Sequence, residues 1–188
     1  ISMDPKNYDR LIEIYEALAD YGYREVGQEY LQNVLNTDKK LDAYDSGRIY
    51  YYLGDYQKAY LALEEAKGKG GVDSYLYLGK AYAATGDYNY ASSVYSNYLS
   101  KQGPDAEIYN QLGLCEMAKK DYQKALEAFQ AGKQIEGNSL MQTLSFNEIV
   151  AYEYLQDYQK AAVLLKAYLQ NYPDDQAAIR EQQFLSTR

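Results

Sequence analysis

The sequence from Tyr75 to Leu99, YLYLGKAYAATGDYNYASSVYSNYL, carries two runs of regularly spaced apolar residues on either side of a Gly-Asp pair. In the first run, Tyr75, Leu78 and Tyr82 recur at intervals of three and four residues, which predicts one face of an α-helix. The second run repeats this spacing, and Gly86-Asp87 is typical of a helix end followed by a helix N-cap. The stretch therefore predicts two short antiparallel helices that need neighbours to bury their apolar faces.

The same turn recurs along the whole chain. Asp-Tyr or Gly-Tyr pairs occur at Gly22-Tyr23, Asp55-Tyr56, Asp87-Tyr88, Asp121-Tyr122 and Asp157-Tyr158. Successive tyrosines of these pairs are 33, 32, 34 and 36 residues apart. A period near 34 residues indicates an array of similar units that stack on one another and bury a continuous core.

This pattern resembles the tetratricopeptide repeat (TPR) family, whose unit has an aromatic residue, Leu-Gly and Tyr on its first helix and Ala with an aromatic residue on its second. These positions are filled by Tyr75, Leu78, Gly79, Tyr82, Ala91 and Tyr95 in one unit and by Tyr109, Leu112, Gly113, Ala125 and Phe129 in the next. The resemblance implies an all-α fold, a right-handed α-solenoid of about five helix-turn-helix units with a C-terminal capping helix.

The predicted units cover residues 7–39, 40–71, 72–105, 106–141 and 142–173, and the capping helix covers residues 174–188. We expect them to form a single domain over residues 1–188, because the linkers between units are too short to separate domains. Gly79 and Gly113 are expected to let a partner helix approach closely, and the Asp of each turn is expected to cap the helix that follows.

The composition argues against most catalytic chemistry. The 188 residues include 25 Tyr, one Cys and no His, with a net charge of −8. The lack of His removes the usual catalytic triads and most transition-metal sites. Cys115 has no basic neighbour that would activate it, so we interpret it as a small buried hydrophobe. We therefore predict neither catalysis, nor a cofactor, nor a metal site.

The acidic charge balance also bears on the class of partner. No basic stripe suited to nucleic acid is present, and no apolar run is long enough to span a membrane. A lone cysteine occurs in exported and cytosolic proteins alike. Two locations therefore stay open, the cytoplasm and an extracytoplasmic site with an anchor that precedes this segment.

In TPR proteins the first helices of successive units line a concave groove that binds a peptide. Superposing the units places Tyr44, Arg48, Tyr51, Tyr52, Leu76, Lys80, Asn110, Leu114, Phe146 and Tyr154 in that groove, with Tyr15, Met117 and Val150 beside them. Each tyrosine taken singly is explained equally well as filler between helices. Arg48 and Lys80 occupy equivalent positions in neighbouring units, which predicts a positive site for a carboxylate or an acidic side chain.

The resulting functional expectation is a non-enzymatic scaffold or adaptor that binds a protein or peptide segment in the groove. The carboxylate clamp of some chaperone-binding family members is represented only by Asn110, so a chaperone tail is not predicted as the partner. An alternative is a structural module that self-associates or forms part of a larger assembly, such as one at the cell envelope.

Overall fold

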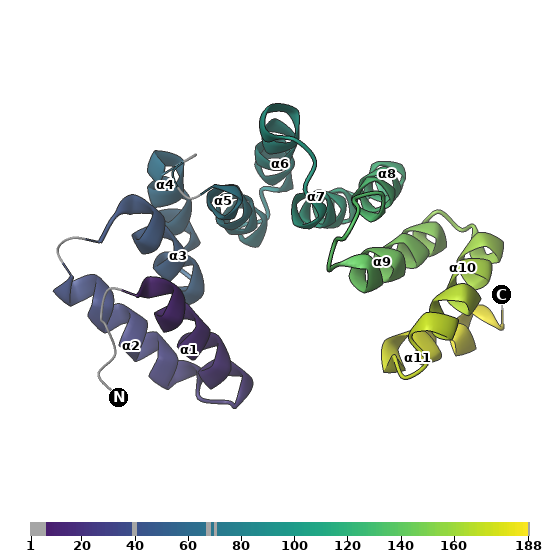
Figure 1. Ribbon diagram of the computed structural model, residues 1–188, viewed down its shortest axis with the longest axis horizontal. Coiled ribbons are helices and arrows are strands. Elements are labelled where there is room, and N and C mark those ends of the chain that lie inside the picture. The colour runs from purple at the N-terminus through teal and green to yellow at the C-terminus, as the bar shows by residue number, and fades with distance from the viewer. Residues whose placement is uncertain (1–6, 39–40, 67–68, 70, 188) are drawn as a thin grey trace. The chain divides into compact units, whose positions relative to one another are not determined.

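The computed structural model describes residues 7–38, 41–66, 69 and 71–187. Over these residues the regular structure consists of α-helices alone, which confirms the predicted all-α class (Figure 1). The helices are α1 (Tyr8–Asp20), α2 (Arg24–Thr37), α3 (Ala43–Leu53), α4 (Tyr56–Ala66), α5 (Val72–Ala84), α6 (Tyr88–Gln102), α7 (Ala106–Ala118), α8 (Tyr122–Lys133), α9 (Met141–Tyr154), α10 (Tyr158–Asn171) and α11 (Gln176–Leu185). The predicted boundary between the first two repeats, at residues 39–40, lies outside the described residues.

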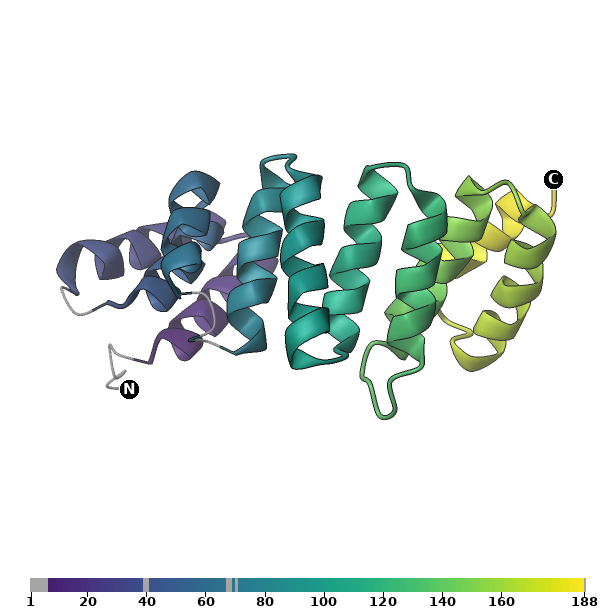
Figure 2. The same ribbon diagram turned by 90° about the horizontal axis from the view of Figure 1, so that it is seen from above.

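The chain divides into two compact units, residues 1–87 (unit 1, with α1–α5) and residues 88–188 (unit 2, with α6–α11). In unit 1, α1 packs on α2 and α3 on α4, and α3 also contacts α5. In unit 2, each helix from α6 to α11 packs on the next one along the chain, as Figure 2 shows for α7 and α8. Both units are therefore built from helical hairpins whose apolar faces are covered by the following helix.

The Asp of the repeated turn caps the helix that follows it, as the sequence predicts. Asp121 Oδ1 accepts a hydrogen bond from Lys124 N at 3.3 Å, and Asp157 Oδ1 accepts one from Lys160 N at 3.0 Å. Lys124 Nζ also forms a salt bridge with Asp121 Oδ2 at 2.8 Å. A side-chain oxygen at this position satisfies a backbone N–H that has no partner inside the helix.

The turn between α1 and α2 is different. The N-cap of α2 is Tyr23, which makes no side-chain capping hydrogen bond. Gly22 before it has a φ of 84°, in the left-handed region that favours glycine. The turn between α1 and α2 therefore reverses the chain as the turns before α8 and α10 do, but it lacks their side-chain capping hydrogen bond.

Close helix approach in unit 2 depends on Gly113. A Cβ atom at Gly113 of α7 would lie 2.3 Å from Cε1 of Phe129, whose side chain on α8 is fully buried. Such a distance is far shorter than any real carbon–carbon contact. The predicted packing role of Gly113 is confirmed.

Candidate partner-binding site

Five tyrosines of unit 1 are in mutual contact across four helices. This tyrosine array consists of Tyr15 on α1, Tyr51 and Tyr52 on α3, Tyr56 on α4 and Tyr77 on α5. Ring centroids are 5.2 Å apart for Tyr15 and Tyr52, 5.4 Å for Tyr51 and Tyr52, and 5.6 Å for Tyr51 and Tyr77. The rings are tilted or edge-to-face, an arrangement that the quadrupole of aromatic rings favours.

Tyr52 is the polar centre of the array. Its hydroxyl donates to Glu16 Oε1 at 2.5 Å and lies 3.0 Å from the hydroxyl of Tyr77. Its backbone carbonyl accepts a hydrogen bond from the hydroxyl of Tyr15 at 3.1 Å. Burial and the neighbouring Glu16 carboxylate raise the pKa of Tyr52 well above its usual value, so the phenol stays neutral and remains a hydrogen-bond donor.

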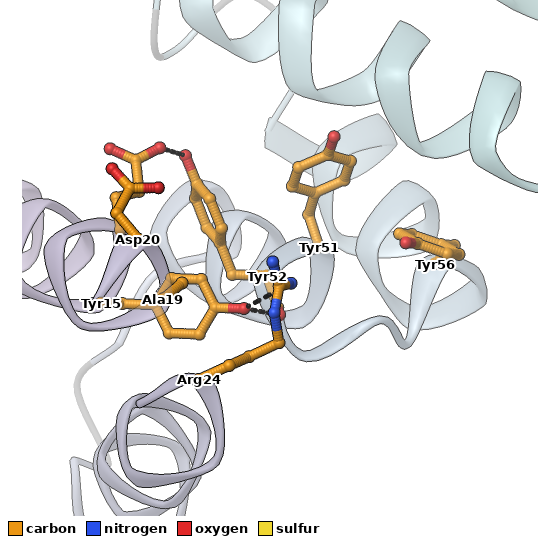
Figure 3. Close-up of a pocket in the computed structure, with 8 residues that line it drawn as sticks. Tyr15, Ala19, Asp20, Arg24, Tyr51, Tyr52 and Tyr56 are labelled. Atoms are coloured by element: carbon orange, nitrogen blue, oxygen red, sulfur yellow. Dashed lines mark hydrogen bonds between the residues drawn. The ribbon is translucent and has the colours of Figure 1, made fainter. Parts of the chain in front are cut away.

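A pocket of about 440 Å³ lies against this array (Figure 3). It is formed where the C-terminal ends of α1 and α3 meet the first turns of α2 and α4. Its lining, called here the tyrosine pocket, is Tyr15, Glu16, Ala19, Asp20, Arg24, Tyr51, Tyr52 and Tyr56. The lining thus combines aromatic surface with three charged side chains, all three of which are exposed.

Several polar groups of the pocket have hydrogen-bonding capacity left over. Arg24 Nη1 donates to the hydroxyl of Tyr15 at 3.5 Å, and in the described part of the chain its guanidinium pairs with no carboxylate. Within the same residues, the Asp20 carboxylate and the hydroxyls of Tyr51 and Tyr56 have no hydrogen-bond partner. A ligand in this pocket would therefore find both donors and acceptors.

Arg48, which the sequence places in the groove, is a buried structural residue. Its side chain is 7 % exposed, and its Nη1 and Nη2 atoms each lie 2.5 Å from a carboxylate oxygen, of Asp9 and Asp45 respectively. Its guanidinium also lies 4.3 Å from the ring centroid of Tyr44. Because Asp9 and Asp45 already neutralise the charge of Arg48, we do not propose Arg48 and Lys80 as a binding site for an acidic ligand.

The other predicted groove residues fall into different environments. In unit 1, Tyr44 and Lys80 are half-buried and Leu76 is buried. In unit 2, Asn110 is buried and its Oδ1 accepts a hydrogen bond from Asn147 Nδ2 at 2.9 Å. The remaining residues in unit 2 are Leu114 and Tyr154, which are exposed, and Met117, Phe146 and Val150, which are half-buried.

Tyr154 and Phe146 both contact other aromatic rings of unit 2. The ring of Tyr154 stacks on Tyr122 with centroids 4.9 Å apart, and the ring of Phe146 lies 5.7 Å from that of Tyr168. Both residues therefore have a packing role, and only Tyr154 of the two also presents most of its surface to solvent.

Five residues of the pocket lining were not among the residues predicted for the groove, namely Glu16, Ala19, Asp20, Arg24 and Tyr56. The basic residue among them is Arg24. It is the first residue of α2, and the repeat pattern assigns second helices to the face away from the groove. The available signal was the turn itself, where Gly22-Tyr23 replaces the usual Asp-Tyr and leaves the following Arg24 without a capping carboxylate beside it.

Unit 2 buries the carboxylates of Glu116 and Glu148. Glu116 Oε1 accepts hydrogen bonds from Ser92 Oγ and Lys119 Nζ, each at 2.8 Å. Glu148 accepts from Gln130 Nε2 at 2.8 Å and from Lys133 Nζ at 2.5 Å. A buried carboxylate needs such partners, and both residues have them, although Glu116 Oε2 is buried without a hydrogen-bond partner among the described residues.

Cys115 behaves as the sequence predicts, as a small buried side chain. Burial and the adjacent Glu116 raise the pKa of its thiol to about 11, so it remains protonated at neutral pH. Among the described residues, no three His, Cys, Asp or Glu side chains gather in a way that could hold a metal ion. In the same residues, no helix is long and apolar enough to cross a membrane.

Comparison with known proteins identifies the repeat. Tetratricopeptide repeat family profiles match residues 76–139 and residues 146–175, which together make up half of the chain. Comparison with curated protein sequences found no match.

Solved structures share the fold at low sequence identity. A thermophilic TPR protein of Thermus thermophilus is 15 % identical, with a TM-score of 0.72 over 96 % of this chain and 100 % of that one. A TPR protein of Parabacteroides merdae is 17 % identical, with a TM-score of 0.67 over 95 % and 72 %. The second TPR domain of human RPAP3, solved with the HSP70 peptide SGPTIEEVD, is 15 % identical, with a TM-score of 0.53 over 58 % and 90 %. From the period, the helical hairpins and these matches together, this chain belongs to the tetratricopeptide repeat family.

Proposed function

We propose that this protein is a non-enzymatic scaffold whose unit 1 binds an extended segment of a partner protein at the tyrosine pocket. TPR folds generally mediate protein–protein interaction, and TPR proteins are generally scaffolds without catalytic activity. In this protein the interaction surface would be the tyrosine pocket, at the ends of α1 and α3. Two of its residues, Tyr51 and Tyr52, belong to the predicted groove.

The single observation that carries the proposal is the tyrosine array beside an open pocket. Tyrosine provides a large apolar contact area together with a hydroxyl, and it is enriched among the residues that dominate binding energies. The array is held by its own ring contacts and by the hydrogen bonds of Tyr52. A surface ordered before binding loses little conformational entropy when a ligand arrives.

The unmatched polar groups of the pocket also suit a peptide. The main chain of an extended segment presents N–H and C=O groups that need partners once they leave water. The hydroxyls of Tyr51 and Tyr56 can donate or accept, and the guanidinium of Arg24 can donate.

Peptide selection from a random heptapeptide library, with the intact chain as bait, tests the proposal. Selected peptides should bind the double variant Tyr51→Ala/Tyr56→Ala at least about tenfold more weakly in a fluorescence titration, because both rings line the pocket. Tyr21→Ala is the matched control, since Tyr21 is 81 % exposed in the same unit and lies outside the pocket lining. Equal affinity of the double variant and the wild type would exclude the tyrosine pocket as the binding surface.

A further inference from the structure

We propose that the tyrosine pocket binds a basic side chain, Lys or Arg, of the partner segment. This inference rests on the proposed function and adds the charge class of the residue that enters the pocket. Three observations support it: two carboxylates line the pocket, aromatic rings lie beside them, and Arg24, the one cation of the lining, makes only a long hydrogen bond there.

Two of the three charges that line the pocket are negative. Glu16 is held in place because its Oε1 accepts a hydrogen bond from the hydroxyl of Tyr52 at 2.5 Å, and its second oxygen accepts none from the residues that the structure describes. Asp20 lies one helical turn further along α1 and lines the same pocket (Figure 3). Residues at this spacing share one face of a helix, so an ammonium or guanidinium group can reach both carboxylates.

The tyrosine rings favour a cation as well. A positive group over the face of an aromatic ring is attracted by the ring quadrupole. Unit 1 already uses this interaction, since the Arg48 guanidinium lies 4.3 Å from the ring centroid of Tyr44 and Lys58 Nζ lies 5.5 Å from that of Tyr50. The long aliphatic stem of Lys or Arg would also cover apolar ring surface while its charged end reaches the carboxylates.

Arg24 is the group that opposes this assignment, and its contacts are few. Toward the described residues its guanidinium makes one long hydrogen bond, 3.5 Å to the hydroxyl of Tyr15, and its side chain is exposed. An exposed arginine with one such contact can turn toward solvent when another cation enters. The wider charge also favours a basic ligand, since residues 1–87 contain 15 Asp and Glu against 10 Lys and Arg.

The same heptapeptide library separates this inference from the proposed function. Peptides selected by the wild type should carry Lys or Arg at one fixed position, and changing that residue to Gln should weaken binding at least about fivefold. The variant Glu16→Gln/Asp20→Asn should lose the preference for the basic residue, and Arg24→Gln should keep or increase it. Circular dichroism confirms that each variant is folded.

Glu25→Gln/Glu65→Gln is the matched control, because it removes two exposed carboxylates of unit 1 that lie outside the pocket. It should keep the preference, which excludes an effect of net charge alone. The inference is overturned, while the proposed function stands, if the selected peptides bind the pocket without a basic residue. The same holds if they carry an acidic residue that strengthens binding to the wild type but not to Arg24→Gln. If no peptide depends on Tyr51 and Tyr56, both fail.

Discussion

Unit 1 and unit 2 share one repeat but bury different charges, since Arg48 is buried in unit 1 and Glu116 and Glu148 are buried in unit 2. In unit 1 the array from Tyr15 to Tyr77 leaves phenol hydroxyls and charged groups around an open pocket. In unit 2 the carboxylates of Glu116 and Glu148 are buried between helices and matched by lysines. The same helical hairpin thus carries the tyrosine pocket in unit 1 and buried carboxylate–lysine pairs in unit 2.

The difference follows from the chemistry of the side chains. A tyrosine buries its ring while its hydroxyl stays near water, so it can fill a half-exposed position without a dedicated partner. A carboxylate in the same kind of position loses its hydration and must be paired inside the protein. We therefore expect changes in unit 2 to alter stability first, and changes at the pocket of unit 1 to alter binding first.

The largest expected effect comes from breaking a buried pair of unit 2. Glu148→Ala leaves Lys133 Nζ and Gln130 without their acceptor, and it should lower the free energy of unfolding by about 3 kcal/mol. Urea denaturation combined with hydrogen exchange of the α8–α10 amides measures this loss. The matched change in unit 1, Glu16→Ala, removes an exposed carboxylate and should cost less than about 1 kcal/mol. Equal losses in the two variants would remove the distinction between the units.

A smaller loss is expected from crowding a helix contact of unit 2. Gly113→Ala forces the ring of Phe129 to move and should destabilise the protein by about 2 kcal/mol. Gly54→Ala in unit 1 is the comparison, because a Cβ there meets no atom within 4 Å but the φ of 80° is strained for alanine. We expect about 1 kcal/mol for that variant. Thermal unfolding in which Gly113→Ala matches the wild type would contradict the packing role.

A pH-dependent effect on stability is expected in unit 2. Burial, followed by the nearby Glu181 of α11, raises the pKa of Glu153 on α9 from 4.5 to about 7. Between these values the folded state binds more protons than the unfolded state, so the contribution of Glu153 to stability is highest at low pH and falls as the pH rises toward about 7.

Glu153→Gln keeps a neutral side chain at every pH. At pH 8 it should therefore increase the free energy of unfolding by on the order of 1 kcal/mol, given the partial solvent exposure of Glu153, and the melting temperature should rise. At pH 4 it should give no gain. Glu136→Gln, at an exposed residue of the same unit, is the control. A gain of the same size at both pH values would show that Glu153 does not titrate as described.

The smallest expected effect is a gain in unit 1. Tyr23→Asp supplies α2 with the capping carboxylate that Asp121 and Asp157 supply to α8 and α10, and it should add about 0.5 kcal/mol. Tyr23 is mostly exposed, so little packing is lost. Slower hydrogen exchange in the first turn of α2 measures the gain, and Tyr21→Asp should leave it unchanged.

The candidate site was only partly predictable from the sequence. Tyr51 and Tyr52 were expected on the groove side because they follow the repeat register, and both line the pocket. The burial of Arg48 was not foreseen, since its partner Asp9 lies 39 residues away in another repeat. Arg24 was missed for a related reason, because the pocket lies between the turn of the α1–α2 hairpin and the turn of the α3–α4 hairpin.

The sequence by itself determined the helices, their pairing into hairpins and the turns between them. These features depend on contacts within about one repeat, and the 34-residue period, the capping Asp residues and glycines such as Gly113 encode them directly. Only the tertiary structure decided which charges are matched and which stay available. Whether Arg48 or Arg24 can meet a ligand depends on carboxylates brought near by packing between repeats, and a repeat pattern specifies the packing positions without specifying the charges placed there.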